Sequence, residues 1–154
     1  FSSRRRHTRY GTVTGVQTCA LPILRYEGQL HCSAVHGPSG RKLETDAPVD
    51  NEGKGESFSP TDLVATALAS CMATIMGIVA KRHSISLEGM EVITTKEMSA
   101  DTPRRIVALK SKITMPLGSN HPQRKLLEAG ALGCPVHHSL DPRIDKCVEF
   151  VWKG

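Results

Sequence analysis

Two of the cysteines in this sequence lie in contexts that could support thiol chemistry. Beyond residue 24 the chain contains Cys32, Cys71, Cys134 and Cys147. We see no secretory signal peptide, and 154 residues can bury a core without disulfides, so we expect a reducing, cytoplasmic compartment. A cysteine there either fills the core or does chemistry. Cys32 and Cys147 lie in strand-like segments and are interpreted as small buried hydrophobes, which leaves Cys71 and Cys134 as candidates.

Cys134 has a local route to activation, whereas Cys71 has none. In the segment GCPVHHSL, Pro135 suits the first position of a new helical turn. This would place Cys134 beside free backbone amides and the positive end of a dipole, where a thiolate is favoured. Cys71 lies twelve positions past the start of its own helix, beyond the range of that dipole. Its activation therefore requires a cation from another segment.

The element that must position Cys71 is an uncharged run at residues 59–81, SPTDLVATALASCMATIMGIVAK. Ser59, Pro60 and Asp62 form a capping-box start, and no charged side chain follows until Lys81. Apolar residues spread around most of the circumference, which predicts a helix packed on nearly all sides. A membrane span is the alternative, but the run is diluted by Ala, Ser, Thr and Gly and flanked by strand-like segments. We predict a core helix and no membrane contact.

The rest of the chain reads as strands and one further helix. Two strands are expected around the turn GPSG, followed by a loose polar loop that could act as a lid. The expected elements are strands 25–36 and 41–49, loop 50–57, strands 85–98 and 105–115, helix 123–133 and strand 144–152. This order is typical of an α+β fold, with an antiparallel sheet wrapped around the long helix.

Residues 1–24 are interpreted as a non-native, disordered leader. They contain four arginines and no acid, and they resemble translated sequencing-adapter text, although a transit peptide or a basic phosphate-binding arm has a similar composition. Residues 25–154 contain 16 basic and 15 acidic residues, so their net charge is +1, although the whole chain carries a formal charge of +5. We therefore predict one domain at residues 25–154 that binds no nucleic acid.

Residues 26–152 resemble the OsmC/Ohr family of thiol-dependent hydroperoxide reductases. The resemblance is carried by the motif SP-x-x-LV-x-x-x-x-x-SC, its continuation Cys71-Met72-Ala73-Thr74, and the motif Cys134-Pro135-Val136-His137-x-Ser139-Leu140. It implies an intertwined homodimer in which two sheets wrap two central helices, with each active site at the subunit interface.

The resemblance also implies the roles of the two thiols. Cys71 would be the peroxidatic cysteine and Cys134 the resolving one, in a reaction that uses an organic hydroperoxide, an external dithiol that could be lipoyl-type, and no cofactor. An apolar substrate pocket is expected to involve Leu68, Met72, Ile75 and His137.

This sequence departs from the family pattern at the group that activates the thiolate. Better-characterised members carry a glutamate directly after the helix-starting proline, where it orients an arginine, but here that position is Thr61, followed by Asp62, as in less characterised branches of the family. We take Asp62 as the candidate carboxylate. The N-terminal hairpin region offers Arg25 and Arg41, and we take Arg41, beside the GPSG turn, as the candidate thiolate partner.

Two other hypotheses remain open. Cys71, Cys134, His137 and His138 could bind zinc, but there is no C-x-x-C pair and adjacent histidines diverge, so we predict no metal. Alternatively, the same fold could be a non-catalytic dimer that binds a small apolar ligand or senses thiol oxidation. An Arg–carboxylate pair beside Cys71 would distinguish catalysis from binding.

Overall fold

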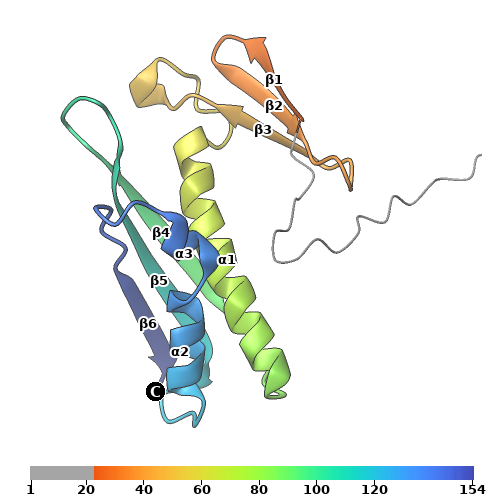
Figure 1. The fold of residues 1–154 in the computed structure, drawn as a ribbon, viewed down its shortest axis with the longest axis vertical. Coiled ribbons are helices and arrows are strands. Elements are labelled where there is room, and N and C mark those ends of the chain that lie inside the picture. Colours follow the sequence, from red (N-terminus) through yellow and green to blue (C-terminus); the bar gives the residue numbers. More distant parts are fainter. Residues whose placement is uncertain (1–22) are drawn as a thin grey trace, which may run out of the picture. The chain divides into compact units, whose positions relative to one another are not determined.

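The computed structural model describes residues 23–154, and its secondary structure is α+β, as predicted (Figure 1). The chain forms two compact units that divide between Glu44 and Thr45. Most of the predicted leader lies outside the described residues. Its last two residues, Ile23 and Leu24, begin the first strand, so the predicted boundary at residue 24 falls inside that strand.

The first unit is built on an antiparallel hairpin of β1 (Ile23–Gly28) and β2 (His31–Val35). β3 (Lys42–Asp46) joins the same sheet in the order β1-β2-β3. The sequence predicted one strand where the hairpin has two. The turn was missed because Gln29 and Leu30 have positive φ angles of 51° and 63°, a conformation that residues of these types rarely adopt.

The second unit contains a three-stranded sheet in the order β4-β5-β6. β4 (Glu91–Met98) and β5 (Ile106–Gly118) are antiparallel, as predicted. β6 (Val148–Lys153) runs parallel to β5, which the sequence did not predict. The chain between them passes through α2 (Arg124–Leu132) and α3 (Pro135–Ser139), and this long crossover permits a parallel pair.

The long predicted helix is α1 (Pro60–Arg82), and its start has the predicted chemistry. The Ser59 side chain accepts a hydrogen bond from the backbone N–H of Asp62, and the Asp62 side chain accepts one from the backbone N–H of Ser59. Together with Pro60 at the first helical position, this reciprocal capping fixes where the helix begins.

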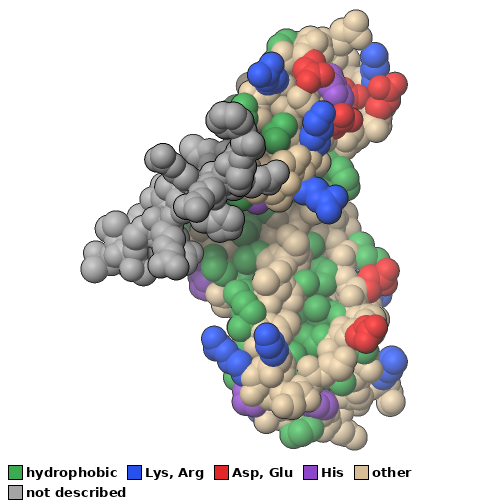
Figure 2. Space-filling model, turned by 90° about the vertical axis from the view of Figure 1, so that its right-hand side faces the viewer, with side chains coloured by type: hydrophobic (Ala, Val, Ile, Leu, Met, Phe, Trp, Pro, Cys, Tyr) green, Lys and Arg blue, Asp and Glu red, His purple; other side chains and the backbone are tan. Residues whose placement is uncertain are grey.

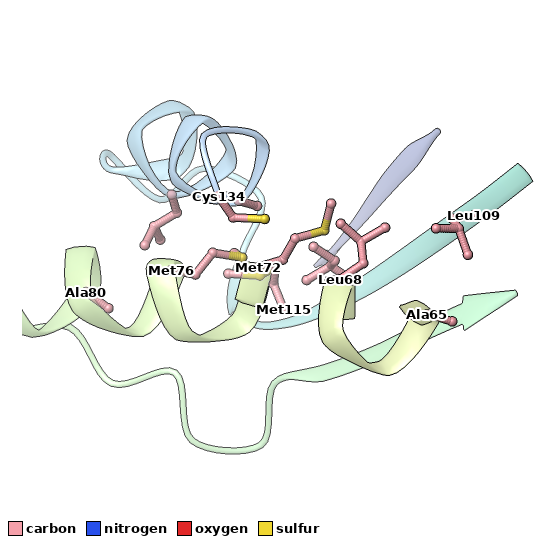
Figure 3. Close-up of a cluster of buried hydrophobic side chains, with 11 residues drawn as sticks. Ala65, Leu68, Met72, Met76, Ala80, Leu109, Met115 and Cys134 are labelled. Atoms are coloured by element: carbon pink, nitrogen blue, oxygen red, sulfur yellow. The ribbon is translucent and has the colours of Figure 1, made fainter. Parts of the chain in front are cut away.

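Within one chain α1 buries one face, although it was predicted to pack on nearly all sides. The buried face joins side chains of β5 and α2 in a single core around α1, part of which Figure 3 shows. Its α1 members are Ala65, Leu68, Met72, Met76 and Ala80. By length and composition α1 could cross a membrane, but this packing against a sheet is what a core helix does.

The other face of α1 is exposed to solvent in the single chain. It carries small or apolar side chains, including Ala67 and Ile78, and the Ile78 side chain is 42% exposed. Figure 2, which turns the right-hand side of Figure 1 towards the viewer, shows hydrophobic side chains gathered on that side of the molecule. This apolar face has no partner among the described residues.

The polar loop before α1 is held in a defined conformation, although the sequence predicted a loose one. The buried carboxylate of Asp46 accepts a hydrogen bond from the backbone N–H of Glu56, and the backbone N–H of Asp46 donates to the carbonyl of Phe58. A side chain at Gly53 would overlap the backbone of Ala47. The loop therefore delivers the chain to the α1 cap in one arrangement.

Lys96 of β4 binds the start of α1. Its ammonium group lies 2.6 Å from Asp62 Oδ1 and 2.8 Å from Thr61 Oγ1, and its side chain is 17% exposed. Burial raises the pKa of Asp62, but hydrogen bonds from Lys96 and Ser59 outweigh it and hold the pKa below its usual value of 3.8. The pair therefore stabilises the folded state above about pH 3.8, and this contribution is lost as the pH falls through the lowered pKa.

Asp62→Asn keeps a capping oxygen but removes the charge that faces Lys96. We expect the free energy of unfolding to fall by about 0.5–1 kcal/mol at neutral pH, a small change because Asp62 is partly exposed. The difference in the free energy of unfolding between variant and wild type, measured by urea unfolding, should disappear as the pH falls below 4. Glu97→Gln, which breaks the exposed pair with Lys110, is the control and should cost less.

Candidate active site

The structure brings Cys71 and Cys134 together, although they are 63 positions apart in the sequence. Cys71 lies near the middle of α1 and is partly buried, whereas Cys134 caps α3 and has no exposed surface. The two thiols are close enough for Cys71 to raise the pKa of Cys134, and both are free. In Figure 3, Cys134 lies over α1 close to Met72 and Met76. The second unit thus contains two free thiols that lie close to each other.

The N-cap position predicted for Cys134 is confirmed, but its predicted effect on the thiol is not. Pro135 is the first residue of α3, and Cys134 Sγ accepts a hydrogen bond of 3.3 Å from the backbone N–H of His137. Burial nevertheless raises the pKa of Cys134. The His137 N–H opposes this, but contact with Cys71 adds to it. Cys134 is therefore a protonated thiol at neutral pH.

The structure places Asp62 away from Cys71. Asp62 precedes Cys71 by nine positions on α1. Because each helical residue turns by 100°, Asp62 lies on the opposite side of the helix from Cys71, and there it binds Lys96. Arg41 lies just before β3 in the first unit, so its role as the partner of the Cys71 thiolate stays a prediction.

The side chains predicted for the substrate pocket have different environments. Leu68 and Met72 have no exposed surface and belong to the core, whereas Ile75 is partly buried at the edge of that core. His137 is also partly buried, and its Nδ1 atom has no hydrogen-bond partner among the described residues. Burial, helped by the neighbouring Lys146 and His138 side chains, lowers the pKa of His137, so its ring is neutral at pH 7.

A cavity of about 620 Å³ lies on the same side of α1 as Cys71, and sequence analysis did not find it. Val64 of α1 lines this cavity. It precedes Cys71 by seven positions, which is about two helical turns, so the two side chains lie almost in line along the helix. Leu140, which directly follows α3, lines it as well. Both side chains pack against the core that contains Cys134. The cavity therefore adjoins both elements that carry the thiols.

The remaining lining of this cavity, which we call the Val64 cavity, is apolar with a few polar groups. It consists of Thr61, Pro103, Arg105, Ile106, Val107, Asp141, Arg143 and Ile144. A second hollow, of about 850 Å³, is lined by Asp62 and Lys96 and lies on the opposite side of α1 from Cys71. The Val64 cavity is thus the better placed of the two for chemistry at the thiols.

The residues considered for a zinc site do not gather into one. Within residues 23–154, no three His, Cys, Asp or Glu side chains are grouped so that they could hold a metal ion. The rings of His137 and His138 stand at 84° to each other with their centroids 5.6 Å apart.

Fold and thiols together define a class of protein: an α+β chain whose long core helix carries one cysteine, with a second cysteine capping a short helix beside it. The sequence model of the family described as OsmC-like protein matches residues 53–146, which is more than half of the chain. The protein belongs to the OsmC/Ohr family, and the resemblance inferred from its motifs is confirmed.

Solved structures share the fold over nearly their whole length. A Psychrobacter arcticus protein, provisionally named as an osmotic stress induced and detoxification response protein, is 43% identical, with a TM-score of 0.81 over 88% of this chain and 98% of its own. The organic hydroperoxide resistance protein OsmC from Legionella pneumophila is 20% identical, with a TM-score of 0.69 over 88% of this chain and 99% of its own. Comparison with curated protein sequences gave no match.

Proposed function

We propose that this protein is a thiol-dependent peroxidase that reduces organic hydroperoxides, with Cys71 as the nucleophile and Cys134 as the resolving thiol. Its family includes proteins named for organic hydroperoxide resistance, which supports a peroxidase-like or stress-response role. The observation that carries the proposal is the proximity of Cys71 and Cys134 within one chain. A reaction that oxidises one thiol can then be completed by its neighbour.

The reaction has three balanced steps. The Cys71 thiolate attacks one oxygen of R–O–O–H, the O–O bond breaks, and the products are the Cys71 sulfenic acid and an alkoxide that takes up a proton to become the alcohol. Cys134 then attacks the Cys71 sulfur, forming a disulfide and releasing water. An external dithiol exchanges with this disulfide and is itself oxidised, which restores both thiols. No step requires a cofactor.

The different burial of the two thiols supports this division of roles. Cys71 is partly exposed, so a peroxide can reach it, whereas Cys134 is fully buried and its pKa is raised. A protonated, buried thiol does not compete for the peroxide. It becomes reactive only when an electrophilic sulfur forms beside it.

The Val64 cavity is the proposed substrate pocket. Its volume is within the range of small-molecule sites, and its walls are mostly apolar. An alkyl or aryl group bound there gains hydrophobic free energy that hydrogen peroxide cannot gain. The site should therefore prefer organic hydroperoxides.

A homodimer would complete the site. The exposed face of α1 includes Ala67 and Ile78, and at 100° per residue Cys71 lies next to this face. A second copy packed on that face would lie beside Cys71 and could bring a cation, for which Arg41 is the candidate. We place this dimer in the cytoplasm, with a dithiol reductant that could be lipoyl-type.

The alternative is a non-catalytic dimer that binds an apolar ligand or senses thiol oxidation. The observation in its favour is Thr61, which stands where better-characterised family members carry the glutamate, together with the position of Asp62 on the far side of α1. If no cation reaches Cys71, its thiolate is not activated.

Steady-state turnover distinguishes the two hypotheses. With dithiothreitol or dihydrolipoamide as reductant, the full chain should consume cumene hydroperoxide with a kcat/KM at least about tenfold above that for hydrogen peroxide. Consumption no faster than by the reductant alone would favour the binding protein, because a binding site needs no turnover.

A further inference from the structure

The core beside Cys71 and Cys134 is rich in sulfur. Met72 and Met76 of α1 and Met115 of β5 have no exposed surface, and they belong to the same core cluster as Cys134. Cys71 packs against this cluster from its edge. In Figure 3 the three methionines lie below Cys134 in one stretch of the core. Thioether groups therefore accompany the two thiols.

The spacing along α1 explains why these sulfur atoms gather. Met72 and Met76 are four positions apart, so both side chains lie on one face of the helix, which is the face that the core covers. Cys71 directly precedes Met72 and lies close enough to Cys134 to raise the pKa of that thiol. Two thiols and two thioethers are thus supplied by neighbouring turns of α1 and by the start of α3.

This set of side chains suits a soft metal ion and does not suit zinc. A structural zinc site takes four ligands from Cys, His, Asp or Glu, whereas residues 23–154 contain no group of even three such side chains. Thiolate and thioether sulfur are the donors that Cu(I) prefers, and this ion is stable with fewer ligands than zinc. The backbone N–H of His137 donates to Cys134 Sγ at 3.3 Å, which would stabilise a metal-bound thiolate there.

We propose that the thiolates of Cys71 and Cys134 bind one Cu(I) ion. The thioethers of Met72 and Met76 supply further sulfur ligands. Copper replaces the proton on each thiol, so both protons leave as the ion binds. Because Cys71 is partly exposed, the ion can reach the fully buried Cys134 through it. The inference does not rest on the proposed peroxidase function, but a disulfide between the same sulfur atoms would abolish the site, so copper binds only the reduced chain.

The first test is an anaerobic titration of the reduced full chain with Cu(I), in the presence of bicinchoninate as a coloured competing chelator. The wild type should retain one Cu(I) per chain. Cys71→Ser should bind at least about a hundredfold more weakly, because it loses a ligand. This variant should fold, since Cys71 is partly exposed. Cys147→Ser removes an exposed thiol away from the site and is the control, which should bind as the wild type does.

The second test concerns the thioethers. The double variant Met72→Leu, Met76→Leu nearly keeps the core volume but removes both thioethers, so the affinity for Cu(I) should fall about tenfold. Met98→Leu, on β4, makes the same change outside the core cluster and should have no effect. X-ray absorption of the copper-loaded wild type should show sulfur atoms alone around the metal.

Three results would overturn the inference: loss of all copper from the wild type to the chelator, equal affinities of the wild type and Cys71→Ser, or nitrogen or oxygen atoms bound to the metal. Wild-type affinity in the double methionine variant would show that these methionines only fill the core, and would overturn their assignment as ligands. Each result is independent of peroxide turnover, so failure of the proposed function and failure of the copper site can be distinguished.

Discussion

Replacing Cys71 with serine should lower the turnover of cumene hydroperoxide by at least about a thousandfold, because the variant lacks the only group proposed to attack the peroxide. The fold should be preserved, since serine is close to cysteine in size and Cys71 is partly exposed. The measurement is steady-state peroxide consumption with dithiothreitol, with circular dichroism to check folding. Cys147, which was expected to be buried, is exposed and lies outside the site, so Cys147→Ser should retain full turnover.

Cys134→Ser should behave differently from Cys71→Ser. Its Cys71 thiolate can still attack, so one equivalent of alcohol should form per chain, but the sulfenic acid then has no resolving thiol. A sulfenic-acid probe should label Cys71 in this variant and not in the wild type. If Cys134→Ser released no alcohol while Cys71→Ser retained turnover, the assigned roles would be reversed.

Leu68→Ala should produce the largest loss of stability among substitutions near the site. Leu68 has no exposed surface and lies in the core between α1 and its neighbours, so removing its side chain leaves a cavity. We expect the free energy of unfolding to fall by about 2–5 kcal/mol, measured by urea unfolding at one fixed protein concentration. Leu126→Ala on α2 makes the same change where the side chain is 40% exposed, and should cost clearly less.

This comparison also separates the core from the substrate pocket. If Leu68 contacted substrate, as its sequence position suggested, its truncation would raise KM with little loss of stability. Equal stability losses for Leu68→Ala and Leu126→Ala would contradict the burial of Leu68.

Features that depend on local chemistry could be predicted from the sequence. The start of α1 follows from Ser59, Pro60 and Asp62, which lie within one helical turn. The capping of α3 by Cys134 follows from Pro135 in the same way. These interactions connect residues that are close in the sequence, so the local sequence pattern predicts them.

Several features that depend on tertiary contacts could not be predicted. Lys96 reaches Asp62 across 34 residues, and nothing near either residue indicates the pair. The raised pKa of Cys134 comes first from burial, which a local sequence does not show. The Val64 cavity is formed by α1, β5 and the segment after α3, which are far apart in the chain. The one available hint was the two-turn spacing between Val64 and Cys71.

The most direct test of the central claim is to map disulfides after adding one equivalent of cumene hydroperoxide to the reduced full chain without reductant. We predict a single disulfide between Cys71 and Cys134 of the same chain, with Cys32 and Cys147 still free thiols. A product in which Cys71 is oxidised to a sulfinic acid while Cys134 remains a free thiol would contradict the two-cysteine mechanism. So would a chain in which neither thiol reacts.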